Sequence, residues 1–563
     1  MLNRRNIRIP LEPSVHRNPY RPRRELATHT VTNQAPPLVD YNAFTTDTAL
    51  NAALEREGGD WGRDRAVAYG DIAGGELMEL GFQANENPPT LHLFDRYGAR
   101  IDEVEFHPAY HRIMQRAKEH GLHSLTWTAD RPGAQVVRSA LYYLHNQFEA
   151  GTACPITMTH AAAPVFARFP DPGRRWLDRV LADAYDDRVI PPADKHGLTV
   201  GMGMTEKQGG SDVRTNTTEA TATDRDGVFT LRGHKWFFSA PMCDLFLVLA
   251  QDDGGLSCFV LPRWTEAGER NAIDIQRLKN KLGDRSNASS EVEFRDTEAY
   301  RIGEAGRGVA TIIEMVSQTR LDCMLGSAGL MRQATVQAIH HARHREAFGQ
   351  RLADAPLMQE VLADLALESE AAMAYAMRLA RAFEGATEHE THLARLATPV
   401  GKYLICKAAP AAVNEAQECL GGGGYVEESI LPRLYRQAPL NSIWEGSGNV
   451  QCLDLLRALA KSPDSIAALE AELAQAGGRH PAFDIHCEAL GTQLKEKTID
   501  PAGARALAGD IARGLQAAIL LTGDAPWVGE AFCAARLAPR RPGAYGTAGL
   551  GDMAPALVER AAI

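Results

Sequence analysis

The chain has 563 residues, 45% of them hydrophobic and 23% charged, and its formal net charge is −11. This length suggests about three or four domains of a soluble globular protein, and the negative charge argues against a surface that coats nucleic acid, while leaving room for a local basic patch. No apolar run is long enough to span a bilayer, and the nine cysteines form neither a CxxC pair nor a zinc-ligand spacing, so we expect a cytoplasmic protein with no disulfides, no bound metal and no membrane contact.

Residues 1–27 are basic. Arginines at seven positions stand against only Glu12 and Glu25, with prolines between them. Such a segment can be an organelle transit peptide or a basic arm, or it can be a disordered extension that follows an upstream start codon. Because the prolines spoil the amphipathic helix that a transit peptide needs, we predict a disordered basic extension.

The remaining chain divides into four predicted domains. Residues 28–195 have a mostly helical pattern, with apolar residues three and four apart in VVRSALYYLHNQFEAG. Residues 196–303 contain the short β-rich runs GVFTLRGHKWFFS, LFLVLAQ, LSCFVLP and SSEVEFRD, which predict a β-barrel or sandwich. Long helical patterns return over 304–460 as a bundle, and 461–563 form a helical C-terminal domain with no recognisable chemistry. The predicted fold is therefore mainly α with a central β-barrel or sandwich domain.

One carboxylate stands out in the stretch GGGGYVEESILPRLYRQAPLNSIWEGSG, between Gly421 and Gly448. Four consecutive glycines are costly to order, so they usually mark a place where the backbone approaches another group closely. Glu445 follows Trp444, and an aromatic wall can raise the pKa of a carboxyl toward neutrality, as a general base requires. The alternative is that Glu445 is only a turn or helix-start residue.

Two further segments suit a flat cofactor. Residues 203–212 (GMTEKQGGSD) combine small and hydroxylated residues that expose backbone N–H groups to a polar ring or a phosphate. The alternative there is an ordinary turn capped by Asp212. Residues 235–239 (KWFFS) place aromatic and hydroxyl groups on a strand that can pack against a ring system, and the alternative is plain core packing.

Six short motifs follow one another along the chain: MTEKQGGSDV, GHKWFFS, KLGDRSNAS, RHREAFG, LGGGGY and IWEGSGN. In this order they resemble the FAD-dependent acyl-CoA dehydrogenases over about residues 195–460, and six ordered motifs are far more specific than one glycine-rich loop. HTVTNQAPPL, CPITMTHAAAP, GMGMTEKQGGSDV and NSIWEGSGN resemble the AidB-type adaptive-response flavoproteins. That second resemblance runs from about residue 28 to the end and includes the C-terminal extension.

The resemblance implies an acyl-CoA dehydrogenase-like architecture, an α, β, α four-helix-bundle order with a helical C-terminal extension, and bound FAD. The RxxFG motif and the glycine run are implied to contact the FAD of a neighbouring subunit, so the oligomer is obligatory for cofactor binding, and the family is typically tetrameric. Many relatives have Trp at the position of Phe237. The implied FAD-binding residues are Met204, Thr205, Gly210, Ser211, Phe237, Ser239, Arg345, Phe348, Gly421, Gly422, Ser447 and Asn449.

The same resemblance makes Glu445 the catalytic base. Removing hydrogen from Cα and Cβ of an acyl thioester needs a base for the acidified α-proton and a hydride acceptor at the β-carbon. Glu445 would take the proton and the flavin N5 the hydride, while hydrogen bonds from a backbone N–H and the ribityl chain stabilise the enolate. Arg320 matches a family arginine near the base; it is either a substrate-site residue or part of a buried ion pair that holds the helices together.

Two positions depart from the family pattern. Glu418 stands where most relatives carry a Gln near the FAD phosphates, and a carboxylate there repels phosphate unless Arg345 or another cation compensates. Ser317 replaces an Asp that lies near the pantetheine in many relatives. Both changes suit the AidB branch and argue against efficient turnover of a metabolic acyl-CoA.

The AidB branch is also associated with double-stranded DNA binding. Residues 461–563 contain ten Lys/Arg against twelve Asp/Glu, so this segment is not net basic. A few arginines in each subunit can still line a channel in an oligomer, because each neutralised phosphate releases counterions; the alternative is a solvated loop. The candidate DNA-binding residues are Arg457, Arg536, Arg540 and Arg541.

The sequence as a whole predicts an AidB-like, FAD-dependent acyl-CoA dehydrogenase that is slow, acts on a short branched acyl-CoA such as isovaleryl-CoA, and binds duplex DNA in protection against alkylation damage. The alternative is an ordinary metabolic short- or branched-chain acyl-CoA dehydrogenase with no DNA role. The expected partners are a second copy of the chain, assembling to a homotetramer, an acyl-CoA and double-stranded DNA.

Overall fold

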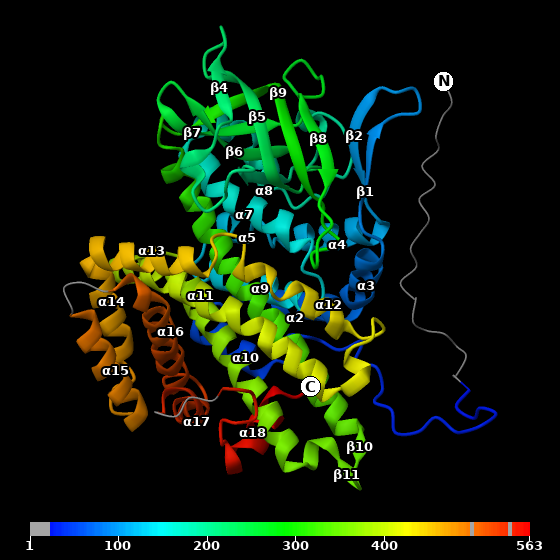
Figure 1. Cartoon of the computed structure of the whole chain (residues 1–563), viewed down its shortest axis with the longest axis vertical. Coiled ribbons are helices and arrows are strands. Elements are labelled where there is room, and N and C mark those ends of the chain that lie inside the picture. The colour runs from blue at the N-terminus through cyan, green and yellow to red at the C-terminus, as the bar shows by residue number, and fades with distance from the viewer. Residues whose placement is uncertain (1–22, 496–499, 539–542) are drawn as a thin grey trace.

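The computed structural model describes residues 23–495, 500–538 and 543–563. A β domain occupies one end of the molecule, a bundle of long helices the other, and N-terminal helices lie where the two meet (Figure 1). This arrangement confirms the predicted mainly-α fold with a central β domain. Of the predicted basic extension, residues 1–22 lie outside the described residues.

The N-terminal part is helical, as predicted, except for one hairpin. All thirteen residues of α6 are buried, because this helix lies in the middle of the molecule. The antiparallel hairpin of β1 and β2, which turns at Gly98 with φ +87°, was not predicted. The elements are α1 (Thr48–Arg56), α2 (Arg63–Ile72), α3 (Met78–Glu86), β1 (Thr90–Phe94), β2 (Arg100–Glu105), α4 (Pro108–Glu119), α5 (Leu125–Thr128), α6 (Ala134–Asn146), α7 (Ala153–Arg168) and α8 (Pro170–Leu181).

The β domain is one strongly curved sheet of seven strands. Its strand order is β3-β5-β4-β6-β7-β9-β8, and the additional pairings β3–β6 and β5–β9 bring strands from distant places in the order into contact, as in a barrel. The four predicted β-rich runs form β5, β6, β7 and β9. The strands are β3 (Val200–Thr205), β4 (Glu219–Ala222), β5 (Val228–Ser239), β6 (Leu245–Asp252), β7 (Gly255–Pro262), β8 (Ile273–Leu278) and β9 (Ser289–Ile302).

The bundle consists of long helices that pack along one another. The predicted long helical patterns correspond to α9, α10 and α11, and only Leu420 separates the end of α11 from the glycine run. A short hairpin of β10 (Glu346–Ala347) and β11 (Gln350–Arg351) lies between α9 and α10. The helices are α9 (Gly308–His344), α10 (Pro356–Ala382), α11 (Glu388–Cys419), α12 (Ile430–Gln437) and α13 (Gly448–Lys461).

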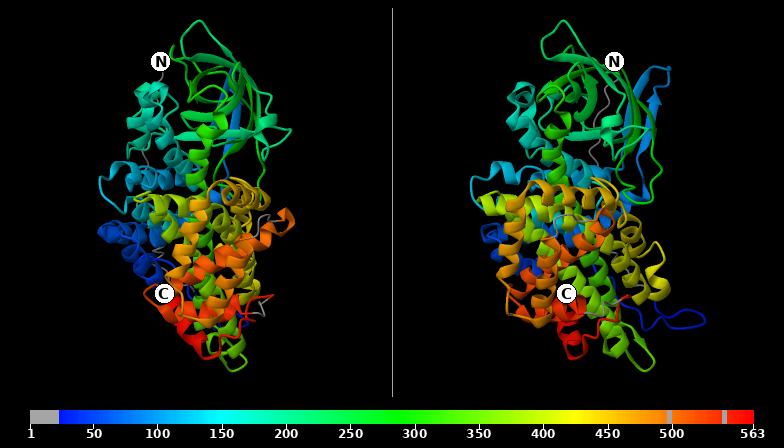
Figure 2. Two further views of the ribbon diagram at one scale, coloured as in Figure 1. Left: turned by 90° about the vertical axis from the view of Figure 1, so that its left-hand side faces the viewer. Right: turned by 60° about the vertical axis from the view of Figure 1, so that its left-hand side comes forward.

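The C-terminal helices pack along the side of the bundle, in orange and red in Figure 2. Their apolar residues join the hydrophobic core of α9, α10 and α11 and form no separate core. Their bounds are α14 (Pro463–Ala474), α15 (Pro481–Leu494), α16 (Ala504–Leu521), α17 (Pro526–Phe532) and α18 (Ala554–Ala561).

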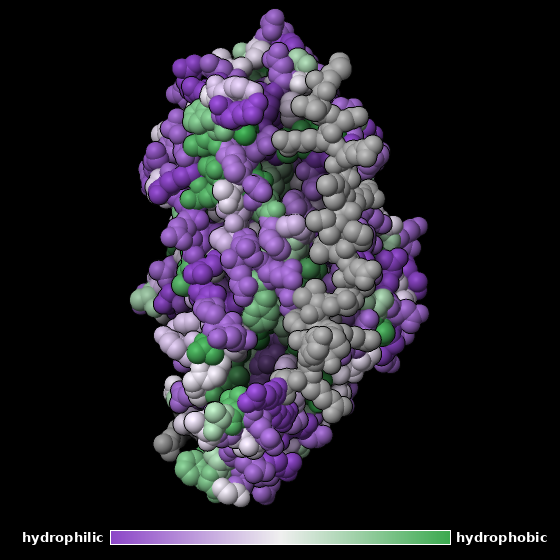
Figure 3. Space-filling model, turned by 90° about the vertical axis from the view of Figure 1, so that its right-hand side faces the viewer, coloured by the Kyte–Doolittle hydropathy of each residue, from purple (hydrophilic) through white to green (hydrophobic). Residues whose placement is uncertain are grey.

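Two hydrophobic cores meet inside the molecule. One fills the β domain and includes apolar residues of α7, and the other fills the helical part. Trp444 packs against both cores, so the segment that carries Glu445 lies at their junction. Hydrophilic side chains predominate on the face in Figure 3, apart from what the grey atoms cover. Among the described residues, no helix has the length and apolar character needed to cross a membrane.

Candidate active site

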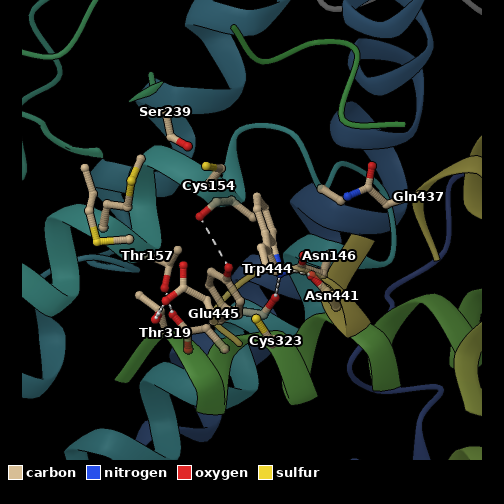
Figure 4. Close-up of a pocket in the computed structure, with 16 residues that line it drawn as sticks. Asn146, Cys154, Thr157, Ser239, Thr319, Cys323, Gln437, Asn441, Trp444 and Glu445 are labelled. Atoms are coloured by element: carbon tan, nitrogen blue, oxygen red, sulfur yellow. Dashed lines mark hydrogen bonds between the residues drawn. The ribbon is translucent and has the colours of Figure 1, made fainter. Parts of the chain in front are cut away.

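A cavity lies between the β domain and the bundle, with Glu445 in its wall (Figure 4). α6 and α7 form one side, β3 and β5 contribute from the β domain, and α9, α12 and the turn before α13 complete the wall. The lining residues are Tyr142, Asn146, Ala150, Ala153, Cys154, Thr157, Met158, Met202, Ser239, Thr319, Asp322, Cys323, Gln437, Asn441, Trp444 and Glu445. The cavity therefore brings the predicted base together with Ser239, one of the predicted flavin contacts.

The backbone of Glu445 is held in a left-handed conformation with φ +56°, which is uncommon for a residue other than glycine. Three side chains bind the carbonyl oxygens of this turn. Lys402 Nζ donates to the carbonyl oxygens of Trp444 and Gly446, both at 2.6 Å. Arg320 Nε donates to Glu445 O at 3.1 Å, and Gln451 Nε2 donates to the same oxygen at 3.0 Å. Glu445 thus lies on a strained turn that surrounding helices hold in place.

The carboxyl group of Glu445 has the properties of a general base. Thr319 Oγ1 lies 2.6 Å from Glu445 Oε2. Burial raises the pKa of Glu445, and this effect outweighs the opposing hydrogen bond from Thr319 and the charges of Lys402 and Arg320. A raised pKa makes the carboxylate a stronger proton acceptor. The indole of Trp444 forms the neighbouring wall, fixed by its Nε1 donating to Asn441 Oδ1 at 2.9 Å.

Arg320 forms the buried ion pair that was one of its two predicted roles, and it also binds the turn that carries Glu445. Its guanidinium forms an ion pair with Asp454 at 2.7 Å, and only 8% of its side chain is exposed. It also holds the backbone of Glu445 through Nε. Arg320 does not line the cavity, so its contact with the base runs through the peptide backbone.

The predicted flavin loop lies at the end of β3. Glu206, within this loop, forms a fully buried ion pair with Lys235 at 2.6 Å and anchors the loop to β5. A Cβ atom added to Gly210 would lie 2.5 Å from Thr205 Oγ1, so only glycine lets the loop fold back on Thr205. Met204, Thr205, Gly210 and Ser211 therefore lie together beside β5.

The residues of this region fit an isoalloxazine ring. Phe237 is 48% exposed, and the Nζ atom of Lys279 lies 4.5 Å from the centroid of its ring. Ser239, two residues further along β5, reaches the cavity that holds Glu445. The loop and the strand thus offer short hydroxyl donors, backbone N–H groups and an aromatic surface on the β-domain side of the base.

Other predicted FAD contacts lie elsewhere in the same chain. Phe348, at the tip of the β10–β11 hairpin, has φ +53° and is fully exposed, and Figure 1 shows this hairpin at the end of the molecule opposite the β domain. Arg345 Nη1 donates to Asn33 O at 2.5 Å. A Cβ added to Gly421 or Gly422 would meet no atom within 4 Å, so packing within the chain does not fill that space. The structure does not bring these residues to the cavity of their own chain.

The adenosine-side candidates lie at the start of α13. Ser447 is the N-cap residue of this 14-residue helix, and its side chain makes no capping hydrogen bond. Asn449 is exposed in the first turn. Both therefore lie where backbone N–H groups of a helix start are unpaired.

The two departures from the family pattern lie on the surface. Glu418 is exposed near the end of α11, and its charge helps to raise the pKa of Glu415, after the larger effect of burial. Ser317 is half-buried on α9 and donates to Ile313 O at 2.9 Å. Arg345 uses one of its nitrogens on Asn33 rather than on Glu418.

The candidate DNA-binding arginines differ in their availability. Arg457 is exposed on α13. The guanidinium of Arg536 is instead taken up inside the chain by Asp364 and Glu368, with 10% of its side chain exposed, so it is not available to a phosphate. This is a correction to the sequence interpretation, which had no means of placing two acidic side chains of α10 beside Arg536. Arg540 and Arg541 lie outside the described residues.

Sequence reasoning missed several residues of the site. Thr319 precedes Arg320 directly, so the segment that was already singled out could have indicated it. Lys402 and Gln451 gave no signal, because a lysine within the long helix α11 and a glutamine in α13 are ordinary residues. Among the described residues, no group of three or more His, Cys, Asp or Glu is arranged to hold a metal ion.

Comparisons with known protein families agree with this geometry. Residues 33–187 match the N-terminal domain of the adaptive response protein AidB. Residues 201–297 match the middle domain of acyl-CoA dehydrogenases, and residues 306–460 match their C-terminal domain.

Two relatives show the extent of the likeness. The putative acyl-CoA dehydrogenase AidB of Escherichia coli (strain K12) is 49% identical over 473 residues, which cover 83% of this chain and 87% of that protein. Acyl-CoA dehydrogenase family member 11 of Caenorhabditis elegans is 32% identical over 482 residues, covering 81% of this chain and 77% of that protein.

Solved structures have the same fold. The structure of Caenorhabditis elegans ACDH-11 in complex with C11-CoA has a TM-score of 0.81 at 27% identity and covers 97% of this chain and 94% of that one. A glutaryl-CoA dehydrogenase from Mycobacterium smegmatis in complex with FADH2 has a TM-score of 0.58 at 19% identity, covering 72% of this chain and 98% of that one.

The fold and the site define a flavoprotein oxidoreductase, with FAD as its cofactor and CH–CH groups as its donors. The chain belongs to the acyl-CoA dehydrogenase family and is AidB-like within it.

Proposed function

We propose that this protein oxidises the Cα–Cβ bond of an acyl-CoA and that Glu445 is the base. The observation that carries the proposal is the position of Glu445: a carboxyl with a raised pKa, in the wall of a cavity that Ser239 also lines. A base must lie within reach of the proton that it removes, and the flavin-side residues fix where the substrate lies relative to it.

The residues of the chain have distinct tasks in this reaction. FAD, when bound, supplies the hydride acceptor for the β-carbon. Glu445 takes the α-proton, and the left-handed turn at this residue aims its carboxyl into the cavity. Lys402 and Arg320 hold the turn by its carbonyl oxygens, so the carboxyl stays in place without a direct ion pair that would weaken it as a base.

We propose a short branched acyl chain, such as isovaleryl, and slow turnover. The large side chains of Tyr142 and Trp444 lie in the cavity wall, which supports a short acyl chain. The exposed carboxylate of Glu418 repels phosphate, and Ser317 lacks the carboxylate that an Asp would offer near the pantetheine, which supports slow rather than efficient turnover.

We propose a homotetramer in which each FAD is bound by two subunits. The full exposure of Phe348 and the open space around Gly421 and Gly422 support this assembly, because no described residue of their own chain fills the positions that the family uses for FAD. We place the protein in the reducing cytoplasm, since all nine cysteines are free and eight of them are buried.

The test is an anaerobic titration of the FAD-loaded protein with short, branched and long acyl-CoAs, following flavin absorbance. We expect bleaching by a short branched thioester. Glu445→Gln preserves the size and polarity of the side chain but cannot accept the proton, so bleaching should slow by at least about a thousandfold. Equal bleaching rates in the wild type and in Glu445→Gln would exclude Glu445 as the base.

A second candidate function is binding of double-stranded DNA in an alkylation response. The match to the N-terminal domain of the adaptive response protein AidB and the exposed guanidinium of Arg457 support it. We expect duplex binding that weakens steeply with salt, and further weakening in Arg457→Ala combined with Arg540→Ala and Arg541→Ala. Arg536→Ala is unsuitable as a probe because it breaks a buried ion pair. Salt-independent binding, or none, would contradict this function.

A further inference from the structure

The hydroxyl group of Thr319 has two acceptors but only one proton. Its Oγ1 lies 2.6 Å from Glu445 Oε2 and 3.0 Å from the carbonyl oxygen of Val316, one turn earlier in α9. A threonine hydroxyl donates one hydrogen bond and accepts up to two. Thr319 is buried, so water does not make up for a missing partner.

Counting protons gives a different arrangement for each charge state of Glu445. When Glu445 is ionised, Thr319 donates to the carboxylate, and the Val316 carbonyl gives up that bond. When Glu445 is protonated, its O–H donates to Thr319 Oγ1, and the Thr319 proton turns to the Val316 carbonyl. Both short distances are then used as hydrogen bonds at once, and no buried donor is left without a partner.

We propose that Thr319 is a positioning residue whose hydroxyl rotates between Glu445 and Val316, so that the base has a hydrogen-bond partner both before and after it accepts a proton. This role rests on the proposed function of Glu445 as base. Without such a partner, the newly formed carboxylic O–H would point into a largely closed site unsatisfied, at a cost comparable to that of a lost buried hydrogen bond. Figure 4 shows Thr319 and Glu445 side by side in the cavity wall.

The other groups around Glu445 do not provide this partner. The thiols and the phenol among them have pKa values raised by burial, so they keep their protons near neutral pH. The arginines and their aspartates are held in ion pairs, and Lys402 is bound to backbone carbonyls. The titratable and charged groups that line the cavity with Glu445 or act on its charge are Tyr142 on α6, Cys154 on α7, Arg320, Asp322 and Cys323 on α9, and Lys402 on α11. Arg138 on α6 and Asp454 on α13 are the ion-pair partners of Asp322 and Arg320.

The experiment is an infrared pH titration of the FAD-loaded protein, with the carboxyl band assigned by its absence in Glu445→Gln. Thr319→Val removes the hydroxyl at constant shape. Because the ionised form loses the stronger, charge-assisted bond, the pKa of Glu445 should rise by about one unit. Thr319→Ser retains the hydroxyl and should restore the wild-type pKa. An unchanged pKa in Thr319→Val, or a serine variant that behaves like valine, would overturn the proposal.

A second readout tests the rotation itself. In protein labelled with carbonyl-¹³C valine, the Val316 carbonyl gains a hydrogen bond as Glu445 is protonated, so a label-sensitive amide band should appear in the pH difference spectrum. It should vanish in Thr319→Val and persist in Thr319→Ser. Its absence in the wild type would refute the rotation. Failure of the base role would show separately, as undiminished bleaching in Glu445→Gln.

Discussion

At the scale of single residues, the site depends on the left-handed backbone conformation of Glu445, which the sequence does not predict. A left-handed conformation costs a residue other than glycine about 1–2 kcal/mol, and Glu445 adopts it one residue before Gly446, which could do so freely. The sequence predicted Glu445 from its neighbours Trp444 and Gly446 and from the resemblance. The structure adds the reason for its orientation: the carbonyl oxygens around it are bound by Lys402 from another helix.

Lys402→Met tests how far this lysine holds the base. The substitution leaves two carbonyl oxygens of the turn without their charged donor, and we expect the free energy of unfolding to fall by about 2 kcal/mol. Flavin bleaching should slow by about tenfold, because a displaced base reacts more slowly. Chemical denaturation and anaerobic bleaching measure the two effects. Lys407→Met, an exposed position on the same helix, is the control and should change neither. A Lys402→Met variant that bleaches at the wild-type rate would contradict the positioning role.

At the scale of secondary-structure elements, prediction succeeded where the pattern is local. Long stretches of apolar residues three and four apart became α9, α10 and α11, and the glycine run ended α11. The hairpin of β1 and β2 was missed because two short strands between helices carry too little periodicity to be distinguished from a loop. The sequence did not distinguish a barrel from a sandwich for the β domain, because its curvature depends on the pairings β3–β6 and β5–β9, which join strands far apart in sequence.

The residues of the candidate site, like the secondary-structure elements, were predictable where they lie in a local sequence motif. Residues within ordered motifs, such as Ser239 and Glu445, could be named and do meet at one cavity. Arg536 could not be placed, because the carboxylates that bind it lie on α10, more than 160 residues earlier in the chain. The assignments of Arg345, Phe348 and the glycine run to FAD remain predictions that depend on a second subunit.

At the scale of the whole molecule, buried ion pairs join the C-terminal helices to the bundle. Arg378 of α10 binds Glu472 of α14 at 2.6 and 2.9 Å and Glu390 of α11 at 2.8 Å. Burial by itself would raise the pKa of Glu472, but the hydrogen bonds and charge of Arg378 outweigh it and lower this pKa below its usual value. A carboxyl group whose pKa is lower in the folded state than in the unfolded state stabilises the fold at pH values above the unfolded-state pKa. This stabilisation is lost as the pH falls through the folded-state pKa.

Arg378→Met therefore has a pH-dependent effect on stability. At neutral pH it leaves the buried carboxylate of Glu472 without its guanidinium partner, while Glu390 keeps its ion pair with Arg381, and we expect the free energy of unfolding to fall by about 3–5 kcal/mol. The difference from the wild type should shrink on acidification through the usual pKa range of glutamate, because the wild type loses the stabilisation by Glu472 while the variant relieves its unpaired charge by protonation. Urea unfolding at neutral and acidic pH measures this difference in the free energy of unfolding, and adding Glu472→Gln to Arg378→Met should recover part of the loss.

Arg351→Met is the matched control, since the ion pair of Arg351 with Asp354 is about half exposed and should contribute less than about 1 kcal/mol. A stability difference that is the same at both pH values would mean that Arg378 acts through packing alone.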